Sequence, residues 1–118
     1  MGIILHIAER DAWEAAAARG QYAPPSLEHE GFIHCSTARQ AVDTANNFFR
    51  GKQGLVLLCI DEGRARAEVR YEPHAGELFP HLYGPLAVDA VVRVVELPPG
   101  ADGTFTLPPE AAALIAGR

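Results

Sequence analysis

The sequence predicts an α+β fold in a single domain, with a mixed β-sheet and two main helices. Strand-like and helix-like segments alternate early in the chain, and mainly strand-like segments follow. At 118 residues the chain has the length of one domain, and no linker or internal repeat divides it. A parallel α/β sheet is the weaker alternative. No glycine-rich phosphate loop follows a strand, which argues against a Rossmann or P-loop site.

The first thirty residues predict a strand, a helix and a loop. Residues 2–8 alternate between a purely aliphatic face and a face that carries His6, as a strand does. A helix over 11–19 is indicated by the capping-box spacing at its start and the glycine after its end. Residues 21–30 are expected to form a loop, because Pro24 and Pro25 oppose regular structure.

Residues 31–36 predict a short strand that leads directly into a helix. His34 and Ser36 share one face of this strand. A second capping box begins at Thr37, and an apolar stripe at helical spacing follows it over residues 38–49.

The second half of the chain predicts mainly strands. Residues 55–60 are apolar throughout, so this strand is expected to be central and covered on both faces. The more polar residues 68–72 suit a strand near an edge. Residues 73–87 hold too many proline, glycine and histidine residues for one regular element. A strong strand follows over 90–97, and a short terminal helix is expected over 110–116.

The bulk composition excludes several classes of protein. A net charge of −5 with scattered basic residues opposes binding to extended nucleic acid but is compatible with a single nucleotide as ligand. No apolar run reaches the roughly 20 residues of a membrane span. The N-terminus does not resemble a secretory signal, so we expect a cytoplasmic protein in which Cys35 and Cys59 are free thiols.

His6 and His34 lie on the less aliphatic faces of two early strands, with Ser36 just beyond. If these strands are neighbours, the two imidazoles can line one groove, where they could donate, accept or carry a proton. A single histidine is more often structural, but the pair with Ser36 favours a ligand site. Nothing in the local sequence enforces a metal site from His6, His34 and His81, so no metal is predicted.

The start of the second helix offers further polar groups. One of Ser36 and Thr37 is expected to cap the helix, which leaves the other for a ligand. The helix N-terminus favours an anion such as phosphate. Cys35 points to the opposite face from His34, and packing in the core is the better interpretation of this thiol.

A second concentration of functional groups follows the strand near residue 72. Glu72 ends that strand before a segment in which His81 and Tyr83 supply ring surfaces and a polar tip. The alternative is a rigid loop that plugs the end of the sheet, with solvated carboxylates. Tyr22 is either a pocket wall or a core aromatic residue.

Many of these residues also match a known family pattern. The matching residues are His6, Trp13, Gly20-Gln21-Tyr22, Ser26-Leu27, Glu30 to Ser36, Gln40, Ile60-Asp61, Tyr71-Glu72, Phe79 to Pro85 and Asp102-Gly103. On these residues the chain resembles, over nearly its whole length, an uncharacterised bacterial family catalogued as domain of unknown function 952. The strings GFIHCS and FPHLYGP are the specific ones.

This resemblance implies a fold similar to that of ADP-ribosyltransferases, with a split, mixed sheet around an NAD cleft. RNA 2′-phosphotransferases give the nearest analogy. On that analogy His6 corresponds to the first histidine of those enzymes and would hold the ribose and phosphate side of NAD. His34 with Ser36 corresponds to their second histidine-containing string, and His34 would help to orient the nicotinamide half. Glu72 is the candidate carboxylate, with Glu77 and His81 in reserve.

The resemblance therefore implies a domain that binds NAD or a related nucleotide and acts as an ADP-ribosyl transferase or NAD glycohydrolase. The expected catalytic residues are His34, Glu72 and His81. The expected ligand-binding residues are His6, His34, Ser36, Thr37, Tyr22 and Tyr83. The alternative is a non-catalytic module for a small molecule or nucleotide that kept the cleft without the chemistry.

Overall fold

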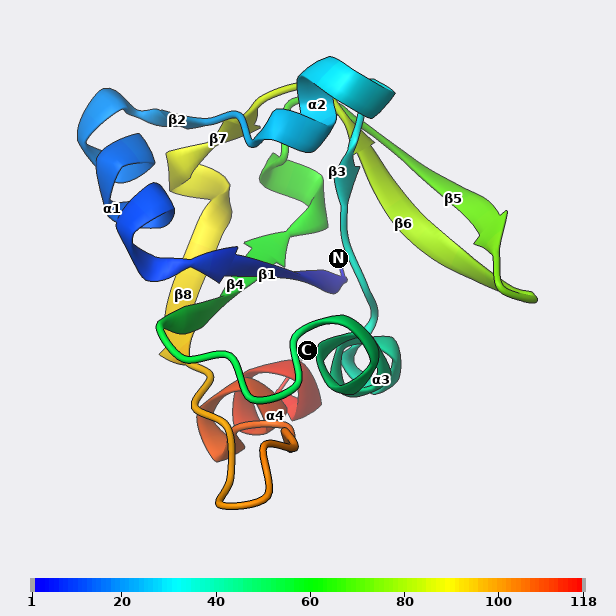
Figure 1. The fold of residues 1–118 in the computed structure, drawn as a ribbon. Helices are drawn as coiled ribbons and strands as arrows, with labels where there is room; N and C mark the ends of the chain where they lie inside the picture. Colours follow the sequence, from blue (N-terminus) through cyan, green and yellow to red (C-terminus); the bar gives the residue numbers. More distant parts are fainter. Residues whose placement is uncertain (1, 118) are drawn as a thin grey trace.

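Three small β-sheets and four α-helices make up residues 2–117, the part of the chain that the computed structural model describes (Figure 1). In chain order the elements are β1 (Ile3–Glu9), α1 (Arg10–Arg19), β2 (Gln21–Tyr22), α2 (Pro25–Glu30), β3 (Ile33–His34), α3 (Ala38–Phe48), β4 (Leu55–Asp61), η1 (Glu62–Arg64), β5 (Glu68–His74), β6 (Glu77–Tyr83), β7 (Leu86–Ala87), η2 (Val88–Ala90), β8 (Val91–Glu96) and α4 (Pro109–Ala116). The predicted α+β class is confirmed, but two main helices were too few.

The strands form sheets in the orders β1-β4-β8, β2-β7 and β3-β6-β5. All of these pairings are antiparallel, so the expected mixture of parallel and antiparallel strands is wrong. Local periodicity specifies which face of a strand is buried and carries no information on its direction. A bridge between Leu5 of β1 and Ser36, with N–O distances of 2.8 and 2.7 Å, connects the first and third sheets.

The central strand β4 separates two apolar cores, and all seven of its residues are buried, as its sequence predicted. Val56, Leu58 and Ile60 pack into one core together with β1 and α1. Leu57 and Cys59 face the other core, which α3 and α4 close (Figure 1). Fully burying one such aliphatic side chain contributes about 1.5–3 kcal/mol, so β4 is a main source of stability.

The two long helices begin in different ways. The predicted capping box of α3 is present, and the Gln40 side chain accepts a hydrogen bond from the Thr37 backbone N–H at 3.1 Å. The capping box predicted at Asp11 is wrong, because β1 runs directly into α1 and leaves Asp11 inside the first turn. Gly20 ends α1 with a φ of 85°, as its position indicated.

Proline misled the sequence interpretation at two places. Residues 21–30 form β2 and α2 and are not a loop, because Pro25 lies at the first position of α2, where a helix needs no N–H. Residues 77–83 form the regular central strand β6 despite Pro80. The Pro80 carbonyl accepts a hydrogen bond from the Cys35 N–H at 3.0 Å, and Cys35 lies beyond the end of β3. The ladder between β3 and β6 therefore does not need the N–H that Pro80 lacks.

Candidate functional site

Five side chains gather on one face of the third sheet, and we call this group the aromatic–histidine cluster. Its members are Phe32, His34, Glu72, His81 and Tyr83. The Phe32 ring stacks on His81 with the ring centroids 4.1 Å apart and the planes at 16°. The His34 and His81 rings stand edge to face at 5.7 Å. The structure therefore brings together all three residues predicted to be catalytic.

Strand register explains why these residues meet. His34 of β3 pairs with His81 of β6, and His81 pairs with Arg70 of β5. Directly paired residues point to the same face of a sheet, and so do residues two positions apart on one strand. Tyr83 and Glu72, each two residues from a member of this row, complete the face.

Two neighbours hold the Glu72 carboxylate. It accepts hydrogen bonds from the Tyr83 hydroxyl and from His81 Nδ1, the latter at 2.8 Å. These bonds, with Tyr83 as the larger cause, lower the pKa of Glu72 and keep it ionised at neutral pH. Because a carboxylate only accepts, we assign the His81 proton to Nδ1, which leaves Nε2 as the nitrogen that can accept a proton.

His34 is anchored by a carboxylate that the sequence interpretation did not single out. Its Nε2 lies 2.8 Å from Oε2 of Glu30, the last residue of α2. Both side chains are about half exposed, so this pair is held in contact with solvent. The spacing of four residues between Glu30 and His34 was the available signal.

His6 meets His34 through the backbone of His34 and not through its ring. His6 Nδ1 donates to the His34 carbonyl at 2.6 Å, and Nε2 accepts from the Tyr22 hydroxyl at 2.9 Å. Burial lowers the pKa of His6 to about 4, so its imidazole is neutral at pH 7. Tyr22 itself is buried against Trp13. His6 and Tyr22 therefore lie together behind the strand that carries His34.

The helix start places the remaining predicted residues. Thr37 is the N-cap of α3, whereas Ser36 is buried and its backbone forms the bridge to Leu5. Cys35 lies in the core as predicted, and burial raises its pKa to about 12. This thiol is therefore protonated at neutral pH and is not an activated nucleophile. Glu77, the reserve carboxylate, bonds Arg39 and Gln40 at the start of α3, away from the cluster.

Sequence interpretation missed Phe32 and Arg70 as parts of the site. Phe32 shares the face of His34 by its two-residue spacing, which was visible, but its stack on His81 depends on a strand about fifty residues later in the chain. The Arg70 guanidinium lies over the Tyr83 ring, 4.3 Å from the centroid. The alternation of Glu68, Arg70 and Glu72 on β5 was the signal for a charged face.

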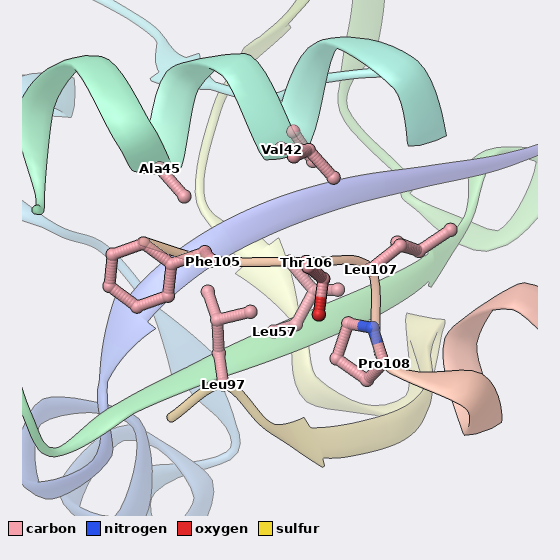
Figure 2. Close-up of a pocket in the computed structure, with 9 residues that line it drawn as sticks. Val42, Ala45, Leu57, Leu97, Phe105, Thr106, Leu107 and Pro108 are labelled. Carbon is pink, nitrogen blue, oxygen red and sulfur yellow. The ribbon is translucent and has the colours of Figure 1, made fainter. Parts of the chain in front are cut away.

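A shallow apolar hollow lies elsewhere, between α3, β4 and residues 105–108, and its volume of about 10 Å³ has room for roughly one water molecule (Figure 2). Thr106 is the only polar residue in the lining of this hollow, and none of the lining residues belongs to the aromatic–histidine cluster. The hollow is a gap in the packing of the second core and presents no catalytic side chain.

Within residues 2–117 no group of three or more histidine, cysteine, aspartate or glutamate side chains is placed to hold a metal ion. None of the described helices is long and apolar enough to cross a membrane.

Comparisons with known proteins agree with this architecture. A family model described as "Protein of unknown function (DUF952)" matches residues 7–94. The chain is similar to the crystal structure of protein CC0527 from Caulobacter crescentus, at 38% identity over 93% of this chain and 98% of that one, with a TM-score of 0.84. The solution NMR structure of CC0527 is similar over 100% of both chains, at 36% identity and a TM-score of 0.75. No curated protein is significantly similar in sequence.

Proposed function

We propose that this chain, which belongs to the DUF952 family, binds NAD or a related nucleotide at the aromatic–histidine cluster and transfers or hydrolyses its ADP-ribosyl group. The observation that carries the proposal is an ionised carboxylate, Glu72, fixed by Tyr83 and His81 beside stacked rings. Flat rings suit a base or a nicotinamide ring, and a fixed carboxylate suits positive charge that develops during reaction. The proposal includes a fold similar to that of ADP-ribosyltransferases, for which the position of His6 on the first strand is the support.

The cluster can supply the parts that this reaction needs. As nicotinamide leaves with the electron pair of the glycosidic bond, C1′ of the ribose becomes an oxocarbenium-like cation, which the Glu72 carboxylate stabilises. The oxygen of water or of an acceptor then bonds to C1′. His81 Nε2, oriented by the bond from Nδ1 to Glu72, takes the proton of that oxygen.

The other predicted ligand residues take supporting roles in this proposal. The His34 ring, held by Glu30, orients the nicotinamide half. His6 and Tyr22 fix the backbone of His34 from behind. In this proposal they support the ribose side of the site through that strand. Ser36 and Thr37 precede α3, and in this proposal the N-terminus of that helix attracts a phosphate of the ligand.

The test combines ligand titration with turnover. Calorimetric titration of the protein with NAD, ADP-ribose and nicotinamide should show binding of NAD and ADP-ribose, and chromatography should show release of nicotinamide from NAD. Glu72→Gln keeps the size of the side chain but removes its charge, so we expect turnover to fall by about 100-fold or more while binding survives.

Glu77→Gln is the matched control, because the same substitution is made on the adjacent strand β6 at a carboxylate engaged by Arg39 and Gln40. Its turnover should stay near that of the wild type. A His6→Ala/His34→Ala double variant should lose binding. The proposal is wrong if the wild-type protein binds neither NAD nor ADP-ribose.

A second candidate is a non-catalytic nucleotide-binding module. The observation in its favour is that the chemical groups are engaged within the protein: Phe32 covers one face of His81, which is 7% exposed, and both His6 ring nitrogens have protein partners. Tight binding of NAD with no nicotinamide released, in the wild type and in Glu72→Gln alike, would select this candidate over the enzyme.

A further inference from the structure

Arg70 occupies an unusual place at the edge of the aromatic–histidine cluster. Its guanidinium lies 4.3 Å from the Tyr83 ring centroid, in the position of a cation that binds the face of an aromatic ring. The side chain is about half exposed and is paired with Glu68 at 2.9 Å on the same strand. Exposed pairs of this kind contribute little to stability, so other forces do not fix the guanidinium firmly in this position.

The ring beneath Arg70 is well suited to a cation. The Tyr83 hydroxyl donates to the Glu72 carboxylate, so a negative charge lies directly at the edge of the ring. Glu68 lies beside Arg70 on the same strand, and Glu30 reaches His34 from the end of α2, so three carboxylates lie near the one guanidinium of Arg70 at this part of the face. At this part of the face, the excess of negative charge favours a cationic group of a ligand over an anionic one.

We propose that Tyr83 and Glu72 form a binding platform for a planar organic cation, and that Arg70 occupies this platform as an intramolecular substitute. An N-substituted pyridinium has the required chemistry, because it is flat, carries a delocalised positive charge and can stack as the guanidinium does. The inference deepens the proposed function and rests on it, since the oxidised nicotinamide ring of NAD is such a pyridinium.

This arrangement predicts in which direction the removal of Arg70 changes the affinity for a cationic ligand. A ligand cation must displace Arg70 from the Tyr83 ring, so Arg70 competes with the ligand. Removal of Arg70 frees the ring and removes a positive charge, and both changes strengthen cation binding. An arginine that held the phosphates of a nucleotide would give the opposite result, because its loss would weaken binding.

The experiment uses 1-methylnicotinamide, a permanent pyridinium cation, and nicotinamide, its neutral counterpart, as probes. Binding is measured by NMR titration of the wild type, Arg70→Gln and Arg39→Gln. Arg39 is the matched control, since it is an exposed arginine paired with a single carboxylate, Glu77, away from the platform. We expect the wild type to prefer the cation, and Arg70→Gln to bind the cation about fivefold more tightly with little change for nicotinamide.

Equal affinity of the wild-type protein for the two probes would overturn the inference, and so would weaker cation binding by Arg70→Gln. The comparison of the two probes on the wild-type protein needs no variant, so it remains valid even if Arg70→Gln does not fold.

ADP-ribose, which lacks the pyridinium, separates this inference from the proposed function. If 1-methylnicotinamide binds as expected and neither NAD nor ADP-ribose does, the platform stands and the proposed function fails. If NAD and ADP-ribose bind equally and 1-methylnicotinamide does not bind, the platform fails.

Discussion

At the scale of single residues, His34 and Cys35 show how adjacent positions acquire opposite chemistry. They are neighbours on one strand, so their side chains point to opposite faces. The His34 ring is exposed beside Glu30, whereas Cys35 is 2% exposed within the first core. Strand alternation alone predicted this separation, and burial then makes the thiol inert.

This difference predicts the reactivity of both cysteines. Burial raises the pKa of Cys35 to about 12 and that of Cys59 to about 11, so neither forms an appreciable thiolate at pH 8. With a disulfide reagent such as DTNB, we expect both thiols to react slowly in the native protein and rapidly in urea. Cys59→Ala identifies the contribution of Cys35. Fast labelling of one thiol in the native protein would contradict the burial of that cysteine.

At the scale of elements, the sequence predicted the features that local residue patterns determine. It did not predict the features that depend on how distant segments of the chain pair. The all-apolar run gave β4 its central place, and the capping box and apolar stripe defined α3. Proline disfavours helices and strands in general, so the sequence around Pro25 and Pro80 indicated no regular structure. The first position of a helix accommodates Pro25, and the end of the β3–β6 ladder accommodates Pro80. The faces of the site residues were likewise predictable, but the register that stacks Phe32 on His81 was not, because periodicity does not specify which strands pair.

Gly84 shows how one turn positions an element of the site. It follows Tyr83 at the end of β6 with a φ of 149°, and a Cβ there would lie 2.9 Å from the Cβ of Ala67. Gly84→Ala should therefore lower the free energy of unfolding by about 1–3 kcal/mol, as measured by urea denaturation. Gly54→Ala is the control, since Gly54 has a φ of 79° but open space around it. An equal or larger loss for Gly54→Ala would show that the contact with Ala67 is unimportant.

At the scale of the whole molecule, His6 connects the three sheets. It belongs to β1 in the first sheet, accepts from Tyr22 of β2 in the second, and donates to the His34 carbonyl of β3 in the third. Such a link works only with a neutral ring, because a protonated Nε2 cannot accept from the Tyr22 hydroxyl. The assembly of the sheets should therefore depend on pH through this one side chain.

The pKa of His6 falls from 6.5 to about 4 on folding, so below pH 6.5 the unfolded chain binds the proton more readily than the folded one. Stability from this residue is present above pH 6.5, declines as the pH falls towards 4 and is lost below it. The full contribution of His6 to the free energy of unfolding is about 3 kcal/mol.

In the His6→Asn variant, the asparagine side chain can still donate to the His34 carbonyl but does not titrate. Urea denaturation should show the wild type losing its stability advantage over His6→Asn between pH 6.5 and pH 4, while the carboxylates, common to both proteins, cancel in the difference. An advantage that stays constant over this interval would mean that His6 is not the pH-sensitive link between the sheets.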